Sequence, residues 1–334
     1  MSFEQYLNSN AQRIDEIIAG SIGKGATPDI ARYLYEPLAA YSANGGKRHR
    51  PLICELACEA VGGDPARARN SAAAIEHFHT AALIHDDIAD ESTLRRGELC
   101  MHLTQGEGLA INAGDLALSL VTGSVLQDTM LEDDVKLRVL DELVKMTTRT
   151  IEGQALDIGW ARDARFDLTI DDYLLMAAHK TAYYSGGTPL AVGAIVGGGT
   201  EKQTEALRAF GMASGVAFQI HDDLLNLIGS KESTKKDFRS DITEGKRTLM
   251  AVHAIQHSPF SDELIGILAS HSTETRELAR AVEIMQSAGS MEYSRDYALS
   301  LVNEAKEELI IVLPPSNPRQ LLLAMADFFV DRMS

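Results

Sequence analysis

Helical periodicity runs through nearly the whole chain and is the feature that most constrains its fold. Apolar residues recur three and four positions apart, whereas the strict alternation typical of a half-buried strand is hard to find. The periodic segments are 3–19, 28–42, 49–60, 67–90, 107–127, 132–159, 169–184, 203–228, 246–256, 261–269, 273–305 and 317–330. Short stretches rich in Gly, Pro, Ser and Asp separate them, and none is long enough to be a domain linker. The pattern predicts an all-α fold in a single domain over residues 1–334.

The acidic balance of the sequence limits its partners. The 334 residues include 48 Asp and Glu against 31 Lys and Arg, so the formal net charge is −17. Such a chain lacks the long basic surface that binds nucleic acid, and it attracts cations instead. Cys54, Cys58 and Cys100 match neither a disulfide framework nor a zinc spacing, which predicts buried thiols. The first residues do not form a basic and apolar leader, and no run is expected to span a membrane, so we expect a cytoplasmic protein without stable membrane insertion.

Two aspartate clusters break the apolar pattern in nearly the same way. The sequence LIHDDIAD at 83–90 returns as QIHDDLLN at 219–226. Other Asp-Asp pairs begin at positions 133 and 171, where they stand at predicted helix starts and satisfy free N–H groups. Capping does not account for the two pairs within apolar helices, and a buried carboxylate is costly without a counter-charge.

The spacing of the first cluster indicates a metal site. Asp86 and Asp90 are four residues apart, so they share one helix face with about 6 Å of rise between them. Two carboxylates so placed repel each other unless cations lie between them. Oxygen ligands suit Mg²⁺, which usually shares its coordination sphere with waters and substrate phosphates.

Basic residues near these clusters would bind such phosphates. Two of them follow the first cluster and others lie in Gly-flanked loops, so the sequence predicts sites for two polyphosphates. They are Lys47, Arg50, Arg95, Arg96, Lys180, Lys236 and Lys246.

These blocks together resemble the trans-isoprenyl diphosphate synthases of the polyprenyl synthetase family. The resemblance covers roughly residues 35–330, and it is carried by GGKRHRP, HTAALIHDDIADESTLRRG, GLAINAGD, EGQALDI, HKTA, FQIHDDLLN and DITEGKRTL, which stand in the family's order. It implies a helical bundle with a core of about ten antiparallel helices around a deep cavity. It also implies a homodimer and Mg²⁺-dependent condensation of isopentenyl diphosphate with an allylic diphosphate, with release of pyrophosphate.

The resemblance further implies three sets of site residues. Asp86, Asp90 and Asp222 would hold about three Mg²⁺ ions, and Asp87 and Asp223 would support them in catalysis. The allylic diphosphate would contact Arg95, Lys180, Thr181, Gln219, Lys236 and Lys246, of which Thr181 and Gln219 would point dipoles at the cationic carbon. Isopentenyl diphosphate would contact Lys47, Arg50, His79 and Arg96.

The helix before Asp86 bears on product length. Ala81 and Ala82 precede Asp86 by one turn and leave room for a growing chain, while Phe78 lies about 12 Å down the same helix. Phe78 is therefore predicted to form the floor, unless it is ordinary core. This predicts geranylgeranyl diphosphate as the product, with farnesyl or longer polyprenyl diphosphates as alternatives.

Two positions depart from the family pattern. Asn226 ends the second motif where many members have Asp, and Arg239 stands where many have Gly. These departures alone favour a non-catalytic subunit of a heteromeric prenyltransferase, which usually lacks the first motif that is intact here. A terpene cyclase would not need Lys47 and Arg50, and a purely structural bundle would leave the basic residues unexplained.

Overall fold

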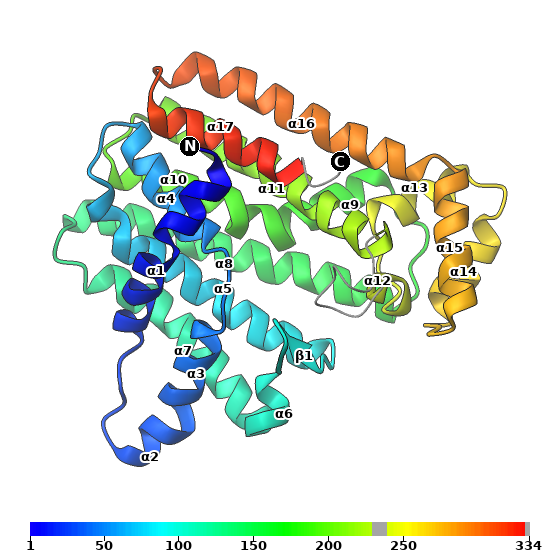
Figure 1. The fold of residues 1–334 in the computed structure, drawn as a ribbon, viewed down its shortest axis with the longest axis horizontal. Helices are drawn as coiled ribbons and strands as arrows, with labels where there is room; N and C mark the ends of the chain where they lie inside the picture. Colours follow the sequence, from blue (N-terminus) through cyan, green and yellow to red (C-terminus); the bar gives the residue numbers. More distant parts are fainter. Residues whose placement is uncertain (229–238, 331–334) are drawn as a thin grey trace. The chain divides into compact units, whose positions relative to one another are not determined.

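The computed structural model describes residues 1–228 and 239–330, and it confirms the all-α prediction (Figure 1). The helices and strands of this part of the chain are α1 (Phe3–Ile22), α2 (Pro28–Ile30), η1 (Ala31–Tyr35), α3 (Glu36–Ala43), α4 (His49–Ala60), η2 (Pro65–Ala68), α5 (Arg69–Ala89), β1 (Leu94–Arg95), β2 (Glu98–Leu99), α6 (Met101–Gln105), α7 (Glu107–Leu126), α8 (Asp133–Arg162), α9 (Ile170–Ala177), η3 (Ala178–Gly187), α10 (Thr188–Val196), α11 (Glu201–Ile228), α12 (Ser240–Thr243), α13 (Leu249–His257), α14 (Ser261–Ala269), α15 (Thr275–Ser287), α16 (Ser290–Val312) and α17 (Asn317–Val330).

The described chain divides into two compact units, and each is described by itself. The first unit contains residues 1–147, 184–208 and 309–325, and the second contains 148–183, 209–308 and the described part of 326–334. A single domain over 1–334 stays a prediction.

Most predicted helix boundaries agree with the structure to within a few residues. Both Asp-Asp pairs that were interpreted as caps stand at helix starts: α8 begins at Asp133, and α9 has a capping box in which Asp172 accepts from the backbone N–H of Thr169 at 2.8 Å.

The predicted helix 273–305 is instead two helices, because Gly289 between them adopts a left-handed φ of 70° that ends α15. The β1–β2 hairpin was not foreseen, since two-residue strands are too short to show alternation.

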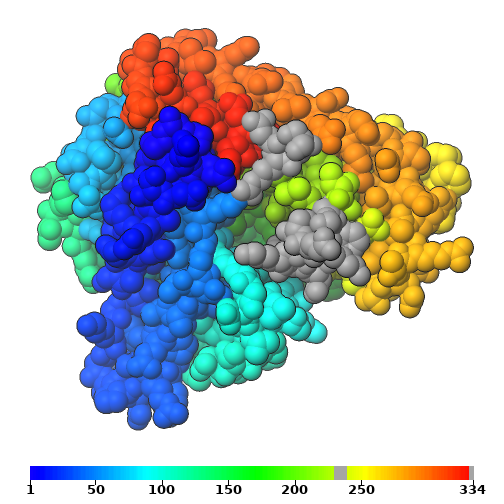
Figure 2. All heavy atoms as spheres, viewed as in Figure 1, coloured from blue at the N-terminus to red at the C-terminus, as the bar shows by residue number. Residues whose placement is uncertain are grey.

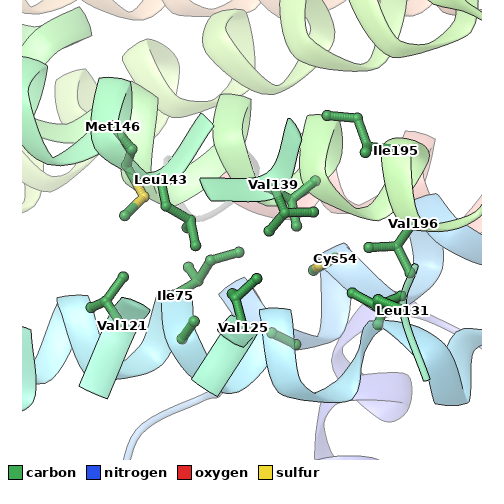
Figure 3. Close-up of a cluster of buried hydrophobic side chains, with 14 of the residues drawn as sticks. Cys54, Ile75, Val121, Val125, Leu131, Val139, Leu143, Met146, Ile195 and Val196 are labelled. Carbon is green, nitrogen blue, oxygen red and sulfur yellow. The ribbon is translucent and has the colours of Figure 1, made fainter. Parts of the chain in front are cut away.

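The main core of the first unit forms where α5 and α7 lie side by side and α8 and α10 pack over them. Figure 3 shows Ile75 of α5 and Val121 of α7 facing Leu143 of α8 across this core. All three side chains are at least 95 % buried. Their burial is the apolar stabilisation that holds the helix carrying the first aspartate motif in place.

The Gly-rich stretch 185–199 serves close helix packing. A Cβ at Gly193 would lie 2.1 Å from the carbonyl oxygen of Cys54, and one at Gly197 would lie 2.6 Å from that of Cys58. Helices α10 and α4 therefore touch through their backbones. Cys54 and Cys58 are buried free thiols, and so is Cys100, as predicted.

Helix α7 corrects one expectation from the sequence. Within the described residues it is the one helix long and apolar enough to cross a membrane by length and composition, although no run was expected to reach that length. Only 33 % of its most apolar window is buried inside the structure. The exposed side of α7 carries the apolar residues Ile111 and Leu126 among polar ones such as Asp115.

Candidate active site

The first aspartate motif occupies the last turn of α5. Asp90 is the C-terminal cap of this helix, and its N–H donates to the carbonyl oxygen of Asp86 at 2.9 Å. The two residues are therefore one turn apart and both half-buried. This is the spacing that the metal prediction requires.

Asp87 points inward from the same turn and has different partners. Its side chain is 1 % exposed, and its two oxygens accept from the Tyr41 hydroxyl at 2.6 Å and from Arg95 Nε at 2.7 Å. Arg95 Nη2 lies 4.0 Å from Asp86. Arg95 thus neutralises the buried carboxylate, which favours a supporting role for Asp87.

A cationic site lies around Tyr184 in the same unit. Arg50, at the start of α4, donates from Nε and Nη2 to the Ser185 hydroxyl at 3.2 and 2.8 Å, and its guanidinium lies 4.5 Å from the Tyr184 ring centroid. The His79 ring stacks on Tyr184 at 5.8 Å. Burial lowers the pKa of His79 well below its usual value, and the charges of Arg50 and Arg96 add to the shift, so the imidazole is neutral.

Arg96 binds the loop that precedes α4. Its Nη1 donates to the carbonyl oxygen of Asn44 at 3.1 Å and also to that of Gly45. Gly46 has a φ of 129°, and a Cβ there would lie 3.1 Å from Arg96 Nη2, so only glycine fits. Lys47 follows as an exposed residue.

The second aspartate motif repeats the arrangement of the first within the second unit. Asp223 is buried, and its two oxygens accept from the Tyr173 hydroxyl at 2.8 Å and from Gln219 Nε2 at 2.6 Å. Thr181 donates in turn to Gln219 Oε1 at 2.5 Å. Asp222 is exposed. In each motif the second aspartate of the pair is therefore buried against a tyrosine, and the first remains accessible.

Lys180 and Thr181 stand on η3, a π-helix of the kind that is frequent at functional sites. Lys180 Nζ forms an ion pair with Asp157. Burial opposes ionisation of Asp157, but Lys180, Lys246 and Arg247 outweigh it and hold the pKa of that carboxyl below its usual value. The site thus keeps a charged aspartate beside the lysine.

The remaining residues singled out in the sequence are Lys236, Lys246 and Asn226. Lys236 lies outside the described residues. Lys246 Nζ lies 2.5 Å from Glu244 and 3.5 Å from Asp241. Asn226, which ends the second motif, accepts from the Asp241 N–H at 3.2 Å and donates to Ser240 at 3.1 Å, so its side chain holds the start of α12.

Arg239 stands in a backbone conformation that suits glycine, the residue that the family pattern has here. It adopts a φ of 60°, the left-handed conformation in which glycine is unstrained. The glycine found in many members would occupy this backbone without strain.

Sequence reasoning missed the side chains that orient the predicted ones. They are Tyr41, Asp157, Tyr173, Tyr184 and Ser185. Asp157 stands inside the block EGQALDI, and Tyr184 and Ser185 follow Lys180 by about one helical turn. Those three residues were therefore discoverable from the sequence, whereas Tyr41 lies 46 residues from its partner Asp87.

The donor set fits Mg²⁺ bound together with a substrate. Among the residues that the structure describes, no group of three or more His, Cys, Asp or Glu side chains is arranged to hold a metal alone. Mg²⁺ is usually held by one or two carboxylates, with waters and substrate phosphates completing its sphere. Asp86 with Asp90 meets this requirement, as does Asp222.

Solved structures define the class to which this fold and these motifs belong. The geranylgeranyl pyrophosphate synthetase of Pyrococcus horikoshii superposes with a TM-score of 0.91 at 34% identity, covering 99% of this chain and 98% of the other. A geranylgeranyl pyrophosphate synthase of Corynebacterium glutamicum, complexed with isoprenyl diphosphate and magnesium, gives a TM-score of 0.85 at 29% identity, covering 99% and 98%. The chain is thus an all-α trans-isoprenyl diphosphate synthase, a prenyltransferase.

Sequence comparison identifies the family. The polyprenyl synthetase model matches residues 31–285. The short chain isoprenyl diphosphate synthase of Methanothermobacter thermautotrophicus is 40% identical, with 99% of each chain covered. The chain belongs to the polyprenyl synthetase family.

Proposed function

We propose that the enzyme condenses isopentenyl diphosphate with an allylic diphosphate and makes geranylgeranyl diphosphate as its main product. The observation that carries this proposal is the site in which the Arg50 guanidinium and the neutral His79 ring both lie against Tyr184. A synthase needs such a site for its second diphosphate, whereas a terpene cyclase does not. The intact turn with Asp86 and Asp90 argues against a non-catalytic subunit.

The proposed roles follow from the partners of each side chain. Bound Mg²⁺, about three ions held by Asp86, Asp90 and Asp222, would neutralise the charge that develops on the leaving pyrophosphate. Lys180 would add a fixed positive charge for the same oxygens. Gln219 is held by Asp223 and Thr181, so its amide would be oriented before the allylic cation forms.

The protein need not supply a nucleophile or a base in this proposal. The double bond of isopentenyl diphosphate attacks the allylic carbon, and the departing pyrophosphate takes the proton lost in the last step. His79 is neutral, so it would donate one hydrogen bond to isopentenyl diphosphate while Arg50 supplies charge.

We further propose that the enzyme is a cytoplasmic homodimer that joins through α7 and α8. Exposed apolar residues stand on both helices of the first unit: Ile111, Leu126, Leu137 and Val144. Leu137 and Val144 are seven residues apart on α8, the spacing of a helix–helix seam. A second copy covering this face would explain why α7 is apolar without a membrane.

An elongation assay tests the proposed activity. Purified enzyme receives labelled isopentenyl diphosphate with dimethylallyl, geranyl or farnesyl diphosphate, and the dephosphorylated products are resolved by chain length. We expect a twenty-carbon product that requires Mg²⁺ and disappears with EDTA, and a loss of about 100-fold or more in kcat for Asp86→Asn. Absence of elongation with every starter would leave the subunit interpretation instead.

A further inference from the structure

Arg48 stands out in the loop before α4 because its backbone is strained. It has a φ of 49°, a left-handed conformation that is uncommon for a residue other than glycine, and its side chain is only 2 % exposed. Such strain persists where the surroundings over-determine the residue, and it is concentrated at functional sites. The conformation turns the chain between Lys47, which is exposed, and Arg50, which is buried.

The contacts of Arg48 show what holds this conformation. Its Nε donates to Asp15 of α1 at 2.6 Å, its Nη1 to Glu76 of α5 at 2.7 Å, and its Nη2 to the carbonyl oxygen of Ser42 at 2.5 Å. All three nitrogens of the guanidinium are therefore engaged inside the protein. The Arg48 side chain therefore binds three elements of the first unit to the loop.

The loop is consequently fixed at two points. Arg96 binds the carbonyl oxygens of Asn44 and Gly45 at one point, and the Arg48 contacts fix the other. Lys47 lies between them. Asp15 makes one of these contacts from α1, which lies on the surface of the first unit (Figure 2, dark blue).

We infer that Arg48, with Asp15 and Glu76, is a positioning group for the isopentenyl diphosphate site. It does not touch the substrate, but it fixes the loop that presents Lys47 and Arg50. The N-terminal helix thereby contributes to substrate affinity through one carboxylate. This inference rests on the proposed function, because it assigns that loop to isopentenyl diphosphate.

Substitutions at Asp15 test the inference with little risk to folding, because that side chain is half exposed. We expect Asp15→Asn to raise KM for isopentenyl diphosphate by about threefold or more, which is the size of effect that loss of an exposed ion pair produces. KM for the allylic substrate and kcat should each change less than about twofold. Asp15→Glu should restore most of the affinity. Glu76→Gln should have the same selectivity and a larger effect, since Glu76 is buried.

A second ion pair of α1 provides a matched control. Arg13 donates to Glu55 of α4 at 2.9 Å, so Arg13→Gln also loosens α1 without removing a contact of the loop. It should lower the melting temperature but leave KM for isopentenyl diphosphate unchanged. Calorimetric binding of isopentenyl diphosphate to the full-length protein, without an allylic partner, measures the same affinity independently of turnover.

The outcomes separate the inference from the proposed function. If wild-type enzyme elongates but Asp15→Asn binds isopentenyl diphosphate normally, the positioning role is wrong and the activity stands. Equal rises in KM for Asp15→Asn and Arg13→Gln would also overturn it, because the effect would then follow from helix α1 as a whole. If wild-type enzyme does not elongate, the proposed function is the part that fails.

Discussion

Adjacent aspartates in both motifs have opposite environments because neighbouring residues on a helix point about 100° apart. When one side chain of the pair faces solvent, the other faces the interior. The interior carboxyl group must then find hydrogen-bond partners, since a buried polar group without them is strongly unfavourable. Tyr41 and Arg95 supply them for Asp87, and Tyr173 and Gln219 supply them for Asp223. The repeated Asp-Asp pair thus combines an accessible ligand with an internal anchor.

The side chain of Phe78 is expected to set the length of the product. It is buried and makes an edge contact with Tyr184 at 5.7 Å between ring centroids. We expect Phe78→Ala to shift the product beyond twenty carbons, because removing the ring would lower the floor next to Ala81 and Ala82. The measurement is the chain-length distribution of the dephosphorylated products.

Loss of a buried ring is also destabilising, by about 3–5 kcal/mol. Phe78→Leu is therefore tested beside it, with Phe3→Leu on α1 as a buried-aromatic control. An unchanged product distribution in both Phe78 variants would leave that residue as ordinary core. Longer products from the Phe3 variant would instead connect chain length with general loosening of the protein.

The chain order explains which site residues the sequence could reveal. Asp86 and Asp90 were predictable as a pair because one helical turn joins them, and Arg95 because it follows within the same block. The anchors were not, since Tyr173 lies 50 residues from Asp223 and only the folded chain brings them together. The left-handed backbone of Arg48 could not be predicted either, because its three partners, Asp15, Ser42 and Glu76, lie at distant positions in the sequence.

Among the helices, small residues decide where two backbones can approach. In the second unit, a Cβ at Gly153 of α8 would lie 2.1 Å from the backbone nitrogen of Lys180 on η3. We expect Gly153→Ala to destabilise the fold by about 1–3 kcal/mol and to lower kcat, because the helix carrying Lys180 must shift. Thermal unfolding and steady-state kinetics measure the two effects.

Gly159 offers a matched control on the same helix. Within the described residues, no atom lies within 4 Å of a Cβ built there. Gly159→Ala should therefore be neutral or stabilise the helix by about 0.5–1 kcal/mol with normal kinetics. Equal behaviour of the two variants would show that contact with Lys180 does not constrain Gly153.

Most helix boundaries were predictable because the signals that set them are local in the sequence. Periodicity, capping residues and glycines act within a few positions, so they are visible in the sequence and place helices such as α4 and α17 closely. The division of 273–305 was missed because periodicity continues on both sides of Gly289 and only the backbone conformation reveals the break. Helix α7 is long and apolar enough to cross a membrane by length and composition although it contains Asp115, which is exposed.

For the molecule as a whole, the exposed apolar side chains of α7 and α8 predict association of two copies. Leu137 is 68% exposed and Val144 is 62% exposed, so replacing both with Glu removes no core contact yet places charges at the centre of the proposed interface. We expect the double variant to sediment as a monomer at concentrations where wild-type protein is a dimer. Ile311→Glu is the control, because Ile311 is 79% exposed on α16 and should leave the dimer intact. A monomeric wild-type protein, or a double variant that remains dimeric, would contradict this interface and require another explanation for the apolar surface of α7.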